Sequence, residues 1–292
     1  MTGNNKGSAK AASLTAEEEA EKERKLSKAV ELDNYENFDV HTWSDYPEVN
    51  KAVDYLYEEL NKLPEFSGNE KIGKKHVKVI VLSLYVIFLE DPQRWARYYR
   101  KESEYRAKTR YNKLHISKKT IRIVDALIDK GYVEQVKGHH GRESGHSSHM
   151  SRMRALPTLV DLLVNTYDVQ PHMVELAPDT ECLILREYDD KAAKQVDVSY
   201  EDTTDTTRMR RELIAYNNLL RRNSIDIITY PHSGVIVGKR KKGKHRKRIH
   251  LNRRQKFIRR VFNNGTFEDG GRFHGGWWQR IPKEWRTEIR IN

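Results

Sequence analysis

The stretch Ile116–Gly138 reads ISKKTIRIVDALIDKGYVEQVKG, and its pattern decides which fold the sequence predicts. Apolar residues at 121, 124, 127 and 128 recur at helical spacing and form one stripe. Ser117 precedes them, and its hydroxyl can accept a hydrogen bond from a free backbone N–H of the first turn. Gly131 follows the last turn, where a left-handed C-cap favours glycine. We therefore expect an amphipathic helix between Ser117 and Gly131.

The residues after Gly131 predict a β-hairpin. Tyr132–Lys137 and Met150–Leu156 alternate like strands, and 138–148 between them holds six glycines or serines and three histidines. Helix, glycine, strand, loop and strand, in this order, resemble the winged helix-turn-helix superfamily. Lys-Gly-Tyr-Val-Glu at 130–134 is similar to that superfamily's link from recognition helix to wing. The resemblance implies that the helix enters a DNA major groove and that the loop is the wing.

Basic residues on this helix and hairpin are the first candidate DNA contacts. Lys118, Lys119 and Arg122 fall mostly away from the apolar stripe, and a basic exposed face is what phosphate neutralisation needs. The candidate contacts in and beside the wing are His140, Arg142, Arg152 and Arg154. The alternative is a winged helix that only holds proteins together.

The composition favours an anionic partner. The chain has 292 residues and a formal net charge of +12, with 33% charged and 37% hydrophobic residues. Nucleic acid is the partner that such a charge predicts. Cys182 is the single cysteine, so an intramolecular disulfide and a thiolate zinc site are not expected, and a reducing compartment fits.

No membrane, metal or cofactor partner is predicted. The N-terminus lacks an apolar signal region, and the apolar run Val77–Leu89 is too short to span a bilayer, so we expect a cytoplasmic protein. Four histidines between 139 and 149 lie in a flexible loop without a thiolate, so we expect hydrogen bonds to DNA rather than zinc binding. No Walker loop and no evident Ser-His-Asp or Cys-His set is present, so no catalytic residue is predicted.

Four regions are expected along the chain, and the fold class is α+β, mainly helical with small β elements. The regions are a flexible N-terminal extension (1–44), a winged helix-turn-helix domain (45–165), a linker (166–205) and a basic C-terminal α+β region (206–292). Expected helices cover Val49–Leu63, Lys74–Leu89, Tyr105–Leu114, Pro157–Val164, Arg208–Arg222 and Arg253–Phe262. Further expected strands are Cys182–Tyr188, Ile225–Ile228 and Gly234–Val237. The helix at Tyr105–Leu114 would be the first of the helix-turn-helix. The Arg208–Arg222 helix is expected to bury Met209, Leu213, Tyr216, Leu219 and Leu220.

The densest charge lies at Lys239–Arg260, which holds thirteen Lys or Arg. No acid occurs between Asp226 and Glu268, so these charges repel one another unless an anion neutralises them. A nucleic-acid backbone is the expected anion. The candidate contacts in this run are Lys239, Arg240, Lys241, Lys242, Lys244, Arg246, Lys247, Arg248, Arg253 and Arg254.

The block Phe267–Gln279 reads FEDGGRFHGGWWQ. Ile281 and Pro282, Arg286 and the final Ile-Arg-Ile-Asn at 289–292 follow it. It resembles a poorly characterised group of proteins from phages, plasmids and integrated elements. Glycines permit positive φ and the close approach of another backbone, so Arg272, Trp277 and Trp278 are expected to form a platform for a nucleotide or a strand. The alternative is an aromatic mini-core around tight turns.

In the group that this block resembles, a segment with a Glu-x-Asp-Tyr element follows and suggests a metal-dependent polymerase or nuclease. This chain ends at Asn292 before such an element, so we expect a truncated form or a relative that kept the binding half.

The first functional hypothesis is a DNA-binding winged-helix protein of a bacterium, phage or mobile element that acts in replication initiation or transcriptional regulation. Double-stranded DNA is the expected partner, with single strands or RNA as alternatives. The competing functions are the binding half of a metal-dependent nucleic-acid enzyme and an RNA-binding accessory protein. No oligomeric state is predicted.

Overall fold

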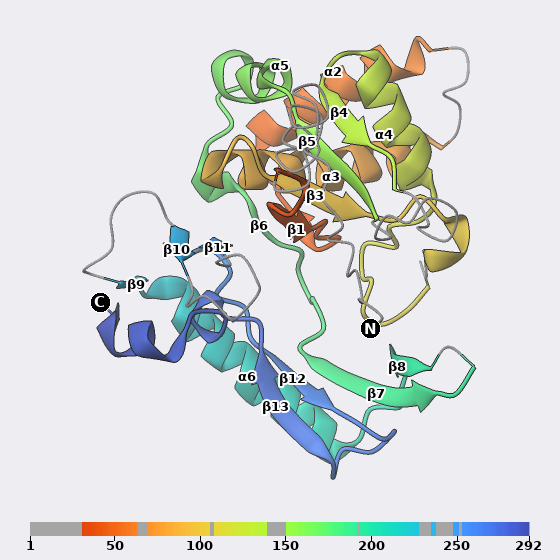
Figure 1. Ribbon diagram of the computed structural model, residues 1–292. Coiled ribbons are helices and arrows are strands. Elements are labelled where there is room, and N and C mark those ends of the chain that lie inside the picture. The colour runs from red at the N-terminus through yellow and green to blue at the C-terminus, as the bar shows by residue number, and fades with distance from the viewer. Residues whose placement is uncertain are drawn as a thin grey trace, which may run out of the picture.

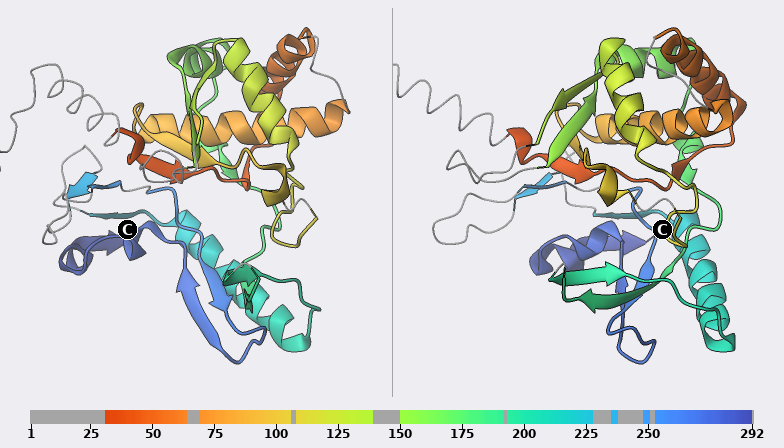
Figure 2. Two further views of the ribbon diagram at one scale, coloured as in Figure 1. Left: turned by 45° about the vertical axis from the view of Figure 1, so that its right-hand side comes forward. Right: turned by 90° about the vertical axis from the view of Figure 1, so that its right-hand side faces the viewer.

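The computed structural model contains two α+β units, each with its own hydrophobic core (Figure 1). The structure describes residues 31–63, 69–105, 108–138, 150–191, 193–227, 235–237, 248–250 and 253–291. The N-terminal unit lies above the C-terminal unit in all three views (Figures 1 and 2).

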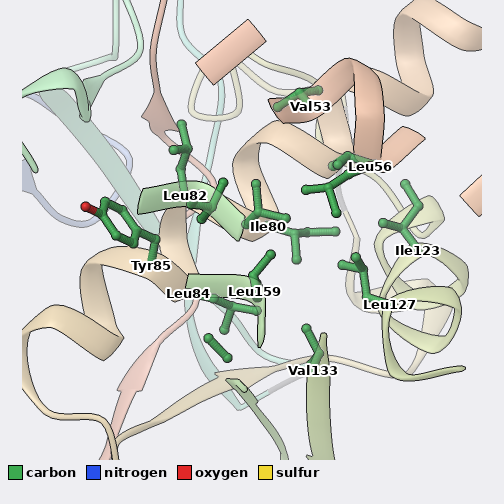
Figure 3. Packing of buried hydrophobic residues seen from close by; sticks show 14 of the residues in the cluster. Val53, Leu56, Ile80, Leu82, Leu84, Tyr85, Ile123, Leu127, Val133 and Leu159 are labelled. Carbon is green, nitrogen blue, oxygen red and sulfur yellow. The ribbon is translucent and has the colours of Figure 1, made fainter. Parts of the chain in front are cut away.

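Three helices form the centre of the first unit because their apolar faces meet. They are α2 (Pro47–Asn61), α3 (Glu70–Glu90) and α4 (Lys119–Asp129). Every residue of 77–85 in α3 is buried, since α2, α4 and a sheet pack around this helix. Figure 3 shows Leu56, Ile80 and Leu127, one from each helix, within this core. The expected helices at 49–63 and 74–89 are confirmed.

A four-stranded sheet packs against α3. Its strands, in order across the sheet, are β1 (Tyr35–Asn37), β3 (Trp95–Tyr98), β5 (Ser151–Ala155) and β4 (Val133–Val136). β4 and β5 pair antiparallel with Val133 opposite Ala155, which confirms the predicted hairpin strands. β3 is antiparallel to β5, and β1 is parallel to β3. The expected closing helix consists of α5 (Pro157–Asp161) and a π-helical turn at Leu162–Thr166.

Glycine ends α4 as predicted. Gly131 has φ 73°, and its N–H donates to the carbonyl of Ile128 at 2.9 Å. The N–H of Tyr132 donates to the carbonyl of Leu127, also at 2.9 Å. These two bonds form a Schellman motif, which satisfies the last carbonyls of the helix and turns the chain directly into β4.

The prediction of a helix at 105–114 is wrong. A 3₁₀ turn at Glu102–Glu104 precedes this segment, and its described part has no regular structure up to Ser117. The Asn112 side chain accepts the Ile116 N–H at 3.0 Å and donates to the Ile116 carbonyl at 2.8 Å, which fixes this course. Side chains of the segment also bond to the second unit, and such tertiary contacts outweigh helix propensity.

The N-terminal extension is less separate than expected. Residues 1–30 lie outside the described residues, but 35–43 carry β1 and β2 (Thr42–Trp43). β2 pairs with β6 (Glu175–Leu176), a strand within the expected linker. The Tyr35 ring lies 4.2 Å from the guanidinium of Arg152. An aromatic side chain and two short strands therefore join this segment to the fold.

The second unit combines one long helix with a four-stranded sheet. In order across the sheet, the strands are β13 (Gly270–His274), β12 (Arg259–Phe262), β7 (Leu183–Asp189) and β8 (Lys194–Asp197). Thr203 caps helix α6 (Thr204–Arg222), because its hydroxyl accepts the N–H of Thr206. The remaining pairs are β9 (Ile225–Ile227) with β14 (Ile289–Ile291), and β10 (Val235–Val237) with β11 (Arg248–His250). Short 3₁₀ turns occupy Pro171–Met173, Trp277–Gln279 and Lys283–Glu288.

Segment 253–262 is not the expected helix but an irregular stretch followed by β12. Its apolar residues at 257, 258, 261 and 262 imitate helical spacing. The register between β12 and β13 shifts between Val261 and Phe262, and both residues are buried. The shift leaves Gly271 of β13 without an opposite residue, whereas β12 keeps its alternation: Phe262 belongs to the second core and Val261 is buried outside that cluster. Burial on both faces of the strand therefore produces the apolar pattern that imitates a helix.

The expected linker at 166–205 contributes β6, β7 and β8. β7 runs parallel to β12 with Leu183 opposite Arg260, and it confirms the strand expected at 182–188. The end of this expected linker contains β8, which pairs with β7. Asp197 of β8 lies opposite Arg186 of β7, and their side chains form a salt bridge of 2.8 Å. This region is therefore part of the second sheet.

A partly buried pair of carboxylates lies where the two units meet. Nη1 of buried Arg94 is 2.6 Å from Glu90 and 3.2 Å from Glu36, and Nη1 of Arg280 in the second unit is 3.9 Å from Glu36. Burial, and then the charge of Glu36, raise the pKa of Glu90 to about 8, although Arg94, Arg254 and Arg280 act in the opposite direction.

This raised pKa predicts that stability falls as pH rises. The stabilisation is complete below the ordinary pKa of 4.5 and is lost as pH rises through about 8, because the folded state holds the proton more tightly. We expect the free energy of unfolding to fall by about 2.5 kcal/mol between roughly pH 5.5 and 7.5, at up to about 1.4 kcal/mol per pH unit. Urea unfolding at both pH values measures it. Glu90→Gln should flatten the profile and exposed Glu58→Gln should not; an unchanged slope in Glu90→Gln contradicts the prediction.

Candidate nucleic-acid interface

The N-terminal end of α4 is held in place by α3. Nε2 of the buried His76 accepts the N–H of Ser117 at 3.0 Å, and Nδ1 lies 2.8 Å from the carbonyl of Ile72. Burial lowers the pKa of His76, so the neutral ring donates through Nδ1. The Ser117 hydroxyl accepts the N–H of Lys119 at 3.4 Å, in the first turn where the sequence predicted such a bond. The start of α4 is therefore fixed relative to the core.

The predicted bases of α4 are exposed at this fixed end. Lys118, Lys119 and Arg122 all face solvent. Lys118 pairs with Glu102 at 2.6 Å, but both side chains are 62% exposed, so the pair is weak and screened by salt. Within the described part of the chain, no salt bridge holds Lys119 or Arg122. The buried face of α4 consists of Thr120, Ile123, Val124, Ala126 and Leu127.

The bases of the hairpin strand are not placed for DNA contact. Arg152 is 5% exposed, and its guanidinium bonds to the carbonyls of Leu32 and Met150. Arg154 bonds to Glu134 and Glu31, and its guanidinium lies 4.2 Å from the Trp95 ring. The strand directs these side chains onto β1 and β3, so we correct both assignments to structural roles. His140 and Arg142 lie outside the described residues.

The basic run divides into two parts. Lys239, Arg240, Lys241, Lys242, Lys244, Arg246 and Lys247 lie outside the described residues, and only the backbone of Arg248 is described, in β11. Arg253 forms a salt bridge of 2.6 Å with Asp226, and Nη1 of Arg254 donates to the carbonyl of Pro171 at 3.0 Å. Arg253 and Arg254 therefore have structural contacts, and Arg254 connects the units.

Glycines shape the turn at the end of the β12–β13 hairpin. Gly275 has φ 125°, and a Cβ there would lie 2.2 Å from the carbonyl oxygen of Phe257. A Cβ on Gly276 would lie 2.5 Å from the ring of Trp278. The glycines thus let the backbone and an indole ring approach more closely than any side chain allows, as the sequence predicted.

The two tryptophans have different environments. Trp277 is 1% exposed within the second core, and its backbone N–H donates to the carbonyl of Gln255 at 2.8 Å. The prediction of a stacking role for Trp277 is therefore corrected to a core role. Trp278 is half-buried, with its ring centroid 6.1 Å from that of Trp277 in an edge-to-face arrangement. Arg272 is exposed on β13, opposite Val261.

A cavity of about 360 Å³ opens beside this block. Its lining comes from α6, β12, β13 and the turn at 277–279 and consists of Met209, Glu212, Leu213, Tyr216, Ile258, Arg260, Phe273, Trp278 and Gln279. Nε of Arg260 donates to the carbonyl of Gly271 at 3.0 Å, and its guanidinium lies 5.8 Å from the Phe273 ring centroid. We name this site the α6–β13 pocket.

The sequence did not single out most residues of the α6–β13 pocket. Tyr216 was expected on the buried face of α6, yet Tyr216 is 47% and Leu219 57% exposed, while Leu213 and Leu220 are buried. The sheet covers only part of α6, which leaves Tyr216 at the pocket. The one signal in the sequence was the GGRFHGGWWQ block itself, which supplies Phe273, Trp278 and Gln279.

Comparisons with protein-family models, curated proteins and solved structures gave no match. Within the described ranges, no group of three or more His, Cys, Asp or Glu side chains could hold a metal ion. In the same ranges no helix has the length and apolar character needed to cross a membrane.

Proposed function

We propose that the first unit is a winged helix that binds double-stranded DNA through α4 and the β4–β5 hairpin. The observation that carries the proposal is the exposed group of Lys118, Lys119 and Arg122 at the anchored start of a helix that leads directly into a hairpin. A fixed basic helix end neutralises phosphates without first losing conformational freedom. The resemblance of 267–292 to proteins of phages and plasmids supports a role in replication initiation or transcriptional regulation.

This proposal differs from the sequence-based expectation in two respects. Segment 102–117 replaces the first helix of the helix-turn-helix, so α4 is positioned by His76 of α3 instead. Arg152 and Arg154 have structural contacts and are not proposed to bind DNA. Among the described residues of the first unit, the proposed phosphate contacts are therefore the bases of α4.

Replacing Lys118, Lys119 and Arg122 together by alanine tests the proposal. We expect duplex affinity at about 0.15 M salt to fall roughly tenfold or more, and the log–log salt slope to flatten by about one unit per lost phosphate contact. Fluorescence anisotropy with a duplex from the DNA flanking the gene measures both quantities. The matched control replaces exposed Lys51, Lys71 and Lys191, which removes the same charge elsewhere.

The proposal fails if a folded α4 variant binds duplex with the affinity and salt slope of the unchanged protein. It also fails if the control variant loses as much as the α4 variant, because binding then follows net charge and not α4.

A second candidate function is the binding half of a metal-dependent nucleic-acid enzyme, which the resemblance of the block at 267–292 favours. Footprinting with and without Mg²⁺ separates the two candidates: protection alone supports a binding protein, whereas strand cleavage or nucleotide incorporation supports the enzyme.

A further inference from the structure

The α6–β13 pocket exposes aromatic rings that the second core does not use. Phe273 is 54% and Tyr216 47% exposed, and they come from different elements, β13 and α6. The half-buried Trp278, which also packs against the second core, completes a set of three rings around one cavity. Exposed rings that gather at a cavity, rather than scatter over the surface, indicate a binding site for a flat ligand.

Polar groups in the pocket suit the edge of a nucleobase. Nε2 of Gln279 donates to the carbonyl of Phe273 at 2.8 Å, which orients its amide oxygen as an acceptor. The exposed carboxylate of Glu212 is a second acceptor on the lining. Amide and carboxylate oxygens accept hydrogen bonds from the amino groups of bases, whereas a carboxylate repels a phosphate. This part of the pocket therefore favours a base.

The charge beside the pocket suits the backbone that carries such a base. Arg260 lies between aromatic rings, 4.9 Å from the Phe262 centroid, and forms no salt bridge with a carboxylate of the described residues. Arg260 is paired across the strands with Phe273, so its charge lies beside the exposed ring. A guanidinium next to stacking rings is the combination that single-strand sites use for phosphate and base together.

We propose that the α6–β13 pocket binds an unpaired base of a nucleic-acid strand, stacked on Phe273 and Trp278. In a duplex the bases are stacked on one another and cannot enter. The pocket thus gives the chain a single-strand contact distinct from the duplex contact of α4. This inference rests on the proposed function for the chemical class of its ligand.

Strands with and without bases test the inference on the full chain. The probe is a fluorescent single-stranded DNA of mixed sequence, compared with the same strand carrying abasic sites throughout. We expect the intact strand to bind roughly 5- to 150-fold more tightly than the abasic strand, the range for one stacked base. Phe273→Ala should reduce this ratio to about one, with little change in melting temperature because the ring is 54% exposed.

Two further variants separate stacking from other effects. Trp278→Ala should also reduce the ratio of intact-strand to abasic-strand affinity to about one. Tyr188→Ala should retain it, because Tyr188 is 52% exposed on β7 outside the pocket lining. Equal binding of intact and abasic strands by the unchanged protein overturns the inference, as does a preserved ratio in Phe273→Ala.

A titration with deoxynucleoside monophosphates distinguishes a strand from a free nucleotide. We expect them to displace the strand weakly; monophosphates that bind as tightly as the strand overturn the assignment to a strand. If the pocket does not bind a base, duplex binding should still depend on Lys118, Lys119 and Arg122. If instead the proposed function is wrong, duplex binding does not depend on these three residues.

Discussion

Glu181→Gln should lower the free energy of unfolding by about 3–5 kcal/mol, the cost of breaking a buried ion pair from one side. The Glu181 side chain is 3% exposed and pairs with two arginines, Arg110 of the first unit at 3.0 Å and Arg210 of α6 at 3.1 Å. Its Oε1 also accepts the N–H of Cys182 at 3.1 Å and that of Leu183 at 3.0 Å, at the start of β7. A neutral amide loses the charge that both guanidinium groups require.

The replacement leaves the two arginines with Asp202, which is half exposed. Asp202 Oδ1 lies 3.0 Å from Arg110 and 2.5 Å from Arg210, so one exposed carboxylate would face two cations. Burial alone would raise the pKa of Glu181, but the Leu183 N–H and the two arginines outweigh it and lower the pKa. The stabilisation by Glu181 is therefore present above its ordinary pKa and is lost as pH falls through the lowered value.

Chemical unfolding near neutral pH measures the loss, with exposed Glu187→Gln as the control. The free energy of unfolding of the control variant should stay within about 0.5 kcal/mol of that of the unchanged protein, as it does for most surface substitutions. Because Arg110 belongs to the first unit, the Glu181→Gln variant is also expected to unfold in two calorimetric steps. A single transition with unchanged midpoint would show that these arginines are satisfied without Glu181.

Local patterns predicted the elements whose stability depends on neighbours in the sequence. Ser117, Gly131 and the apolar stripe between them define α4, and the alternation after Gly131 defines the hairpin. Segments 105–114 and 253–262 also carry helix-like patterns, yet both contribute to contacts between distant parts of the chain. Helix propensity amounts to fractions of a kcal/mol per residue, so such contacts decide the outcome.

The candidate site was predictable to the same limited extent. Exposed bases on α4 followed from helical periodicity, since charges opposite an apolar stripe face solvent. Arg152 looked equivalent in the sequence, but β5 turns it onto Tyr35 of a strand more than a hundred residues earlier. The α6–β13 pocket needs Tyr216, Arg260 and Phe273 from three elements, and no spacing along the chain shows that these elements meet.

Gly275→Ala should destabilise the second unit by about 4 kcal/mol, of which strained backbone supplies roughly 1–3 and steric overlap roughly 1–3. At φ 125° only glycine is comfortable, and a Cβ would lie 2.2 Å from the carbonyl oxygen of Phe257 and 3.3 Å from its carbon. The two backbones must then separate. That separation stretches the bond from the backbone N–H of Trp277 to the Gln255 carbonyl, now 2.8 Å, and so loosens the buried side chain of Trp277.

Gly131→Ala is the matched control, because it isolates the backbone cost from the steric one. Gly131 has φ 73°, and a Cβ there would meet no atom within 4 Å, so only the left-handed conformation is penalised, by about 1–2 kcal/mol. Thermal and urea unfolding of both variants give the comparison. Since Phe273 and Trp278 flank Gly275, the Gly275 variant should also lose its preference for intact over abasic strands, while Gly131→Ala keeps it. Equal destabilisation by the two substitutions would show that the turn moves away from Phe257 at no cost, and the close contact would then not be what shapes the α6–β13 pocket.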